Sequence, residues 1–138
     1  MSIIIRHIKG IMLVSGALTS TMLLAALAPA TALHSTFGDT LSGPLAELVV
    51  RNWGVLIGII GVMLMYGAVD PQYRRVSLVM AIVSKVAFIA LVLSNGARFL
   101  AYGAGTAVLV DSVMVATFVA YLIATRRPAS VPAHHVRS

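Results

Sequence analysis

The sequence predicts an all-α protein: a bundle of four transmembrane helices that run antiparallel, up and down, with both termini in the cytoplasm. Three observations predict this fold class. The chain of 138 residues is 59% hydrophobic and only 10% charged, with a mean hydropathy of +0.99, whereas soluble domains carry about 25% charged residues. The apolar residues form long runs, each near the ~20 residues that cross a bilayer. The basic residues lie mostly at the ends of these runs.

The apolar runs define the expected helices and the domain organisation. We expect spans at about residues 11–33, 48–69, 76–94 and 106–125. Together they make residues 1–125 a single transmembrane domain. Residues 126–138, "RRPASVPAHHVRS", are polar and contain proline, a composition typical of a disordered cytoplasmic tail.

The first span has a second interpretation. Its basic start and the small residues Ala30 and Ala32 also match a secretory signal peptide with a cleavage site. Its apolar run, however, exceeds the ~7–15 residues of a signal-peptide core. We therefore expect residues 1–32 to be retained as a membrane helix, with cleavage as the alternative.

The second span carries three glycines on one helix face, Gly54, Gly58 and Gly61. Helices in lipid associate by close van der Waals contact, which small residues permit. We expect this face to pack against a neighbouring helix, with the first span as candidate partner; the alternative is a ligand lying against the bare backbone. The span ends at Asp70-Pro71 because proline cannot continue a helix, so the second and third spans should form an antiparallel hairpin.

The basic residues orient the predicted bundle. Two of them, Arg51 and Arg98, lie on one side of the membrane, and seven lie on the other: Arg6, Lys9, Arg74, Arg75, Arg126, Arg127 and Arg137. The positive-inside rule then places both termini and the turn after the second span in the cytoplasm. No basic stripe with interleaved aromatic residues occurs, which argues against a nucleic-acid partner. The expected partner is the lipid bilayer.

Two charged residues, Lys85 and Asp111, lie several residues or more from either end of a predicted span. An unpaired lysine near the bilayer centre, the position of Lys85, costs about 2.5–3.5 kcal/mol. Asp111 in the fourth span is the expected partner, because a short connection brings the outer halves of the third and fourth spans together. Charges inside a membrane indicate a functional site by default, and a purely structural salt bridge is the alternative.

Further polar residues are expected in the same outer half, where they would line a cavity open to the outside beneath a lid formed by residues 34–47. The predicted ligand-binding set is Lys85, Asp111, Arg51, Asn52, Glu47, Arg98 and His34. Four of these residues also have a simpler interpretation. Glu47 and Arg51, four residues apart on one helix face, would form an exposed pair, Arg98 would anchor to lipid headgroups, and His34 would be solvated.

Metal and cofactor chemistry find little support in the sequence. The chain has no cysteine, no H-E-x-x-H motif, no Walker loop and no paired histidines within a span. We therefore predict no metal site and assign no catalytic residue. No cofactor is predicted either, although quinone suits a mostly apolar pocket with a few polar groups.

Residues 44–93 combine three features: "RNWG" at the start of a glycine-rich helix, a short turn with an arginine pair, and a helix with an embedded lysine. In this the segment resembles the small bacterial four-helix membrane proteins of the DoxX-like superfamily. The resemblance implies a four-helix bundle in a bacterial inner membrane. It also implies an association with quinone or terminal-oxidase systems, or with detoxification, as in some members. No family motif carries a catalytic residue over to this chain.

Three hypotheses of function follow. The leading one is a membrane protein that binds a small apolar, quinone-like or lipid-like molecule in an outward-facing cavity, with Lys85 and Asp111 as polar anchors and Arg51 and Asn52 at the rim. The second is a membrane-embedded enzyme, an isomerase or a redox subunit, that uses Lys85 and Asp111 as acid and base. The third is a structural or assembly subunit whose glycine face docks on a larger membrane complex, or on a second copy in a homo-oligomer.

Overall fold

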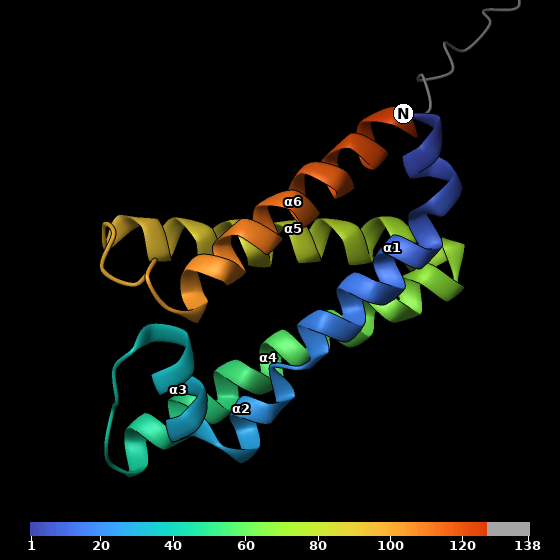
Figure 1. The fold of residues 1–138 in the computed structure, drawn as a ribbon. Coiled ribbons are helices and arrows are strands. Elements are labelled where there is room, and N and C mark those ends of the chain that lie inside the picture. The colour runs from blue at the N-terminus through green and yellow to red at the C-terminus, as the bar shows by residue number, and fades with distance from the viewer. Residues whose placement is uncertain (127–138) are drawn as a thin grey trace, which may run out of the picture.

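The computed structural model describes residues 1–126 and is all-helical, without a strand in that range. Its helices are α1 (Ser2–Ser20), α2 (Leu23–Leu27), α3 (Pro29–Phe37), α4 (Pro44–Val69), α5 (Pro71–Ser94) and α6 (Gly103–Ala124) (Figure 1). Four helices are long and apolar enough to cross a membrane: Ser2–Leu27, which joins α1 and α2, then α4, α5 and α6. The all-α prediction and the four candidate spans are thus confirmed. Residues 127–138 of the predicted tail lie outside the described residues.

The first span differs most from its prediction at its start. It begins at Ser2 rather than near residue 11, and it ends at Leu27. Several isoleucines among the first residues continue the apolar helix past Arg6 and Lys9, which the prediction treated as flanking charges. A helix can include such residues near its end because their long side chains reach the polar interface.

The end of the predicted first span forms a separate helix. Pro29 restricts the backbone of the residue before it, and Ala28 adopts φ −130° and ψ 69°, outside the helical region. The chain therefore turns at Ala28, and α3 starts with Pro29 in its first turn. Residues 29–33, expected at the outer end of a continuous span, instead belong to this short helix.

Two later helices begin at prolines, slightly before their predicted starts. Pro44 and Pro71 occupy the first turns of α4 and α5, where the missing N–H costs nothing. Asp70 caps α5, because its side-chain Oδ1 accepts a hydrogen bond from the Gln72 backbone N–H at 2.9 Å. The Asp70-Pro71 step therefore ends α4 and starts α5, as the sequence predicted.

The glycine face of α4 packs against the first span. A Cβ atom on Gly61 would lie 2.7 Å from the Gly16 carbonyl oxygen, and one on Gly16 would lie 2.6 Å from the Gly61 carbonyl oxygen. A Cβ on Gly54 would lie 2.7 Å from the Met22 carbonyl oxygen, and Gly58 faces the Leu23 side chain. Any side chain here would separate the backbones, so the contact requires glycine.

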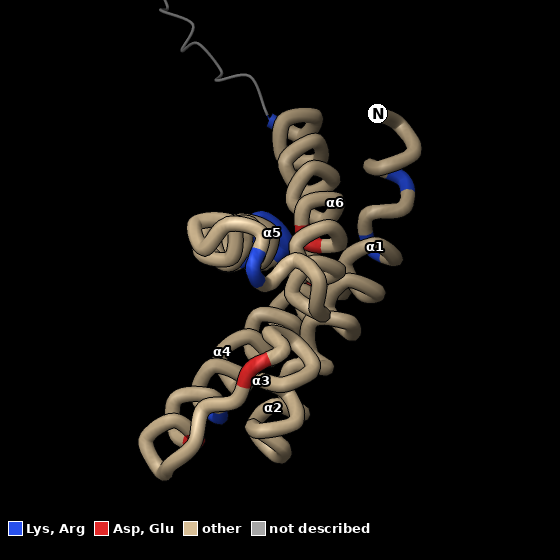
Figure 2. Tube along the Cα trace, turned by 60° about the vertical axis from the view of Figure 1, so that its left-hand side comes forward, with Lys and Arg blue, Asp and Glu red and all other residues tan. Residues whose placement is uncertain are grey.

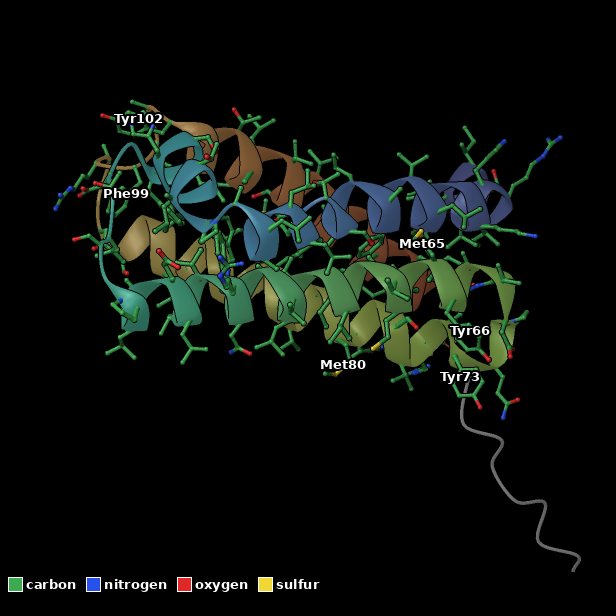
Figure 3. All side chains as sticks on the ribbon, turned by 90° about the horizontal axis from the view of Figure 1, so that it is seen from below. Met65, Tyr66, Tyr73, Met80, Phe99 and Tyr102 are labelled. Atoms are coloured by element: carbon green, nitrogen blue, oxygen red, sulfur yellow. The ribbon has the colours of Figure 1, made fainter. Side chains whose placement is uncertain are left out.

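The two ends of the molecule differ in what they contain. The N-terminus, the α4–α5 turn and the last residues of α6 lie at one end, here called the turn end (Figure 1). Helices α2 and α3 lie toward the other end, here called the α3 end. Tyr66 and Tyr73 pack together at the turn end, with ring centroids 5.3 Å apart, whereas Phe99 and Tyr102 lie at the α3 end (Figure 3).

A buried apolar core fills the half of the bundle nearer the turn end. All four long helices contribute to it: Ile8, Met12, Leu64, Ala68, Leu78, Ala81 and Phe118. Figure 1 shows α4 and α5 as a V that opens from their turn toward the α3 end. The core therefore closes the narrow half of the bundle.

Candidate functional site: a cavity beside the buried ion pair

The half of the bundle nearer the α3 end contains a partly open cavity of about 650 Å³. Side chains from α1, α3, α4, α5 and α6 line it. Figure 2 shows that few positions along the helices are charged. The lining nevertheless includes both intramembrane charges of the predicted spans, Lys85 and Asp111.

Lys85 and Asp111 form a salt bridge. The Lys85 Nζ lies 2.5 Å from the Asp111 Oδ1, and the two side chains are only 7% and 17% exposed. Nζ also donates a hydrogen bond to Thr19 Oγ1 at 3.3 Å. The predicted pairing of the two charges is therefore confirmed, while their role in binding a ligand stays a prediction.

The hairpin of α5 and α6 brings the two charges together. They are 26 residues apart in sequence, on either side of the connection at residues 95–102. Lys85 lies one helical turn from the core residue Ala81, which marks where the packed core ends. The ion pair thus forms the inner boundary of the cavity, next to the apolar core.

The Lys85 ammonium retains hydrogen-bonding capacity. An ammonium has three N–H donors, and within residues 1–126 it donates to Asp111 and Thr19. One donor is therefore left for an acceptor atom in the cavity that Lys85 lines. A buried donor of this kind favours a partner strongly, because leaving it unpaired costs about 1–3 kcal/mol.

The walls between the ion pair and the α3 end are mainly apolar. Trp53 and Ile57 from α4 face the cavity, as do Phe88 and Leu91 from α5. Trp53 also packs on Phe37 at the end of α3, with ring centroids 6.0 Å apart. This arrangement suits a small, largely apolar molecule, because such pockets combine apolar walls with a few polar groups that fix orientation.

Hydroxyl side chains near the α3 end form a second polar region of the cavity. Ser35 and Thr36 from α3 and Thr106 from α6 line it. A Cβ on Gly103 would lie 2.7 Å from the Ser35 carbonyl oxygen, so α3 packs directly against the start of α6. The predicted lid over residues 34–47 is thus built partly from a helix, and only residues 38–43 are a connection without helical structure.

The other predicted binding residues do not line the cavity. Arg51 donates a hydrogen bond to the Ala26 carbonyl oxygen and lies 3.9 Å from Glu47. The expected rim at Arg51 is therefore wrong, because the helical repeat places it about 200° around α4 from Trp53, which faces the cavity. The simpler interpretation, an exposed Glu47–Arg51 pair, is the one that the structure shows.

Asn52, Arg98 and His34 are also exposed and outside the cavity. Arg98 pairs with Asp39 at 3.3 Å, and both side chains are mostly solvent-accessible. This pair joins the 38–43 connection to the 95–102 connection at the α3 end. These residues therefore belong to the outer surface of the bundle, not to its interior.

Sequence reasoning missed the hydroxyl residues of the site. Thr19 and Thr106 lie within apolar helices, where a hydroxyl is compatible with packing, lipid contact or a cavity. A signal was present, because a lone lysine needs more than one acceptor and Thr19 is a polar residue in the neighbouring span. Among residues 1–126, no group of three His, Asp or Glu side chains is placed to hold a metal ion.

No protein-family model, curated protein or solved structure matches the chain. The resemblance of residues 44–93 to the DoxX-like superfamily stays a prediction.

Proposed function

We propose that the chain is an integral protein of a bacterial inner membrane that binds a small, mostly apolar molecule with a hydrogen-bond acceptor, such as a quinone or a lipid-like carbonyl compound. The observation that carries this proposal is the Lys85 ammonium, held by Asp111 and Thr19 beside an apolar cavity with one donor left over. The volume of about 650 Å³ lies within the range of about 300–1,000 Å³ for small-molecule pockets.

The proposed bundle is antiparallel, up and down, with both termini cytoplasmic and the cavity facing outward. The charge distribution supports this orientation. Of the basic residues within the described range 1–126, only Arg51 and Arg98 lie at the α3 end, whereas the turn end carries Arg6, Lys9, Arg74, Arg75 and Arg126. Because basic residues favour the cytoplasmic side, the turn end faces the cytoplasm and the cavity lies in the outer half of the membrane.

The positions of the polar side chains in the cavity support one orientation of the bound molecule. Its acceptor oxygen takes the remaining Lys85 N–H, and its apolar body packs on Phe88 and Leu91. Ser35 and Thr106 are available to a second polar group. A quinone carries carbonyl oxygens on opposite sides of its ring, so it matches two polar regions separated by apolar walls.

The chain contains a single tryptophan, Trp53, and it lines the cavity. Its fluorescence therefore reports occupancy. We expect a decyl-substituted benzoquinone to quench Trp53 saturably in detergent-solubilised protein. A linear, non-saturating response, as given by free quencher dissolved in the micelle, would contradict a defined site.

The variant that tests the anchor is Lys85→Met/Asp111→Leu, which removes both charges and so leaves no buried charge unpaired. We expect its apparent affinity for the quinone to fall about tenfold or more, because a hydrogen bond from a charged donor is worth about 1.5–3 kcal/mol. Arg98→Gln serves as the control, since it removes an exposed charge outside the cavity. Equal affinities in all three proteins would refute the anchor.

The direct contact of an ammonium and a carboxylate supports a second candidate, acid–base chemistry on the bound molecule, as in an isomerase or a redox subunit. Such a pair can give and take a proton at one site. A binding protein returns its ligand unchanged after incubation, whereas an enzyme converts it. Asp111→Asn would then abolish conversion while keeping quinone-dependent quenching.

The third hypothesis, an assembly subunit, relied on a glycine face available for docking. In the structure that face is covered by α1 and α2. It therefore offers no support for a partner complex or a homo-oligomer at this surface.

A further inference from the structure

A second, polar cleft lies at the turn end, away from the cavity. It has a volume of about 890 Å³ and is formed by the start of α5 and the end of α6. Its lining includes Gln72, Arg74, Arg75, Tyr121, Thr125 and Arg126. The cleft therefore gathers three of the chain's arginines from two helices that meet at one end of the bundle.

The positive charge of this cleft is not balanced by its own lining. No acidic residue lines it, and the salt bridges found among residues 1–126 involve Arg51, Lys85 and Arg98 instead. The nearest carboxylate in sequence, Asp70, caps the Gln72 backbone N–H. Three guanidinium groups in one cleft without a carboxylate attract an anion.

Arg74 is held in place at the base of the cleft. Its Nε donates to the Gly67 carbonyl oxygen at 3.2 Å and its Nη2 to the Ala68 carbonyl oxygen at 3.0 Å. A guanidinium has five N–H donors, so three remain after these bonds. Because its planar fork is fixed, Arg74 can bind two oxygens of a phosphate without further ordering of its side chain.

The cleft also lies at the level where lipid headgroups would be. It is formed at the ends of two candidate spans, α5 and α6, at the same end of the bundle as the Tyr66–Tyr73 pair. Tyrosines are enriched at membrane interfaces. Tyr121 and Leu122 give the cleft an apolar side, against which a glycerol or acyl segment can pack.

We propose that this cleft binds a phosphate-bearing anion through Arg74, Arg75 and Arg126. Two sources share that chemistry: the headgroup of an anionic phospholipid and a soluble phosphate. Basic pockets between transmembrane helices on the cytoplasmic side are suited to anionic headgroups. The proposal is independent of the ligand of the outer cavity, since no lining residue is shared.

The test uses full-length protein with Arg75→Gln and Arg126→Gln, because both residues are exposed and their loss leaves the helix-capping bonds of Arg74 intact. Arg6→Gln is the matched control: it removes the same charge at the turn end but outside the cleft. In the first arm, native mass spectrometry measures binding of phosphatidylglycerol, with phosphatidylcholine, which is zwitterionic and has no net charge, as the reference lipid. In the second arm, phosphorus NMR line broadening measures inorganic phosphate in a phosphorus-free detergent.

We expect phosphatidylglycerol affinity to fall about fivefold in each cleft variant, the effect of one basic residue near an anionic headgroup, and less than twofold in Arg6→Gln. The same selective loss seen only with inorganic phosphate would support the cleft with a soluble phosphate as its source. Equal losses in all three variants would mean diffuse charge attraction only and would overturn the proposal. Absence of binding in both arms would overturn it as well.

Discussion

The two halves of the bundle use the same helices in opposite ways. In the half near the turn end, α1, α4, α5 and α6 close around a buried apolar core, whereas in the half near the α3 end they enclose a cavity. Small residues explain the closure, because a Cβ on Gly67 would lie 2.6 Å from Ser77 Oγ, so α4 and α5 touch there. In the other half, Trp53 of α4 and Phe88 of α5 both line the cavity.

Lys85 and Asp111 lie at the boundary between the packed core and the cavity. A charge within the core would have no room for partners, and a charge in lipid would have none at all. At the boundary the two side chains are largely buried and still line the cavity.

Stability should therefore depend on the two halves unequally. Phe118 is fully buried in the core, and Phe118→Ala should lower the free energy of unfolding by about 3–5 kcal/mol, because it leaves a void among packed side chains. Phe88→Ala removes the same side chain from a cavity wall, where space already exists, and should cost about 1 kcal/mol or less. Unfolding of both variants in the same detergent gives the difference. Similar losses would mean that the two halves are equally well packed.

The second prediction concerns the Lys85–Asp111 ion pair at the boundary between core and cavity. Lys85→Met leaves the Asp111 carboxylate buried without a partner and should destabilise the fold by about 3 kcal/mol. Lys85→Met/Asp111→Leu should recover most of that loss, because no charge then remains buried. Thermal unfolding of the two variants beside the unaltered protein measures the recovery. If the single variant were as stable as the unaltered protein, the Asp111 carboxylate would have to be hydrated in the folded state and would not be a buried, unpaired charge.

The sequence was informative where a physical effect acts along the chain or where small residues mark a helix face, as the glycines of α4 do, and it was less informative about which other side chains turn inward. Four apolar spans follow from summed hydropathy, and the Lys85–Asp111 pair follows from the cost of lone charges in an apolar setting. Which other side chains of α4 turn inward is set by packing, so Trp53 in the cavity and Arg51 outside it were not predictable from residue type. The break at Ala28 likewise depends on how α3 docks, although Pro29 marked the position.

The contact between α1 and α4 runs along both halves and gives the smallest predicted effect. A Cβ on Gly61 would lie 2.6 Å from the Ser20 backbone nitrogen and 2.7 Å from the Gly16 carbonyl oxygen, and neither backbone atom can move independently of its helix. Overpacking costs about 1–3 kcal/mol, partly offset by the helix propensity of alanine, worth about 1 kcal/mol over glycine. Gly61→Ala should therefore destabilise the protein by up to about 2 kcal/mol.

Gly10 in α1 is the matched control, because a Cβ there would meet nothing within 4 Å. Gly10→Ala should keep the propensity gain and stabilise the protein by up to about 1 kcal/mol. Opposite signs for the two substitutions, measured in one detergent, would show that α1 and α4 pack too closely at Gly61 to admit a Cβ. If both substitutions were stabilising, α1 and α4 could separate at little cost to admit the Cβ, and their contact would not require glycine.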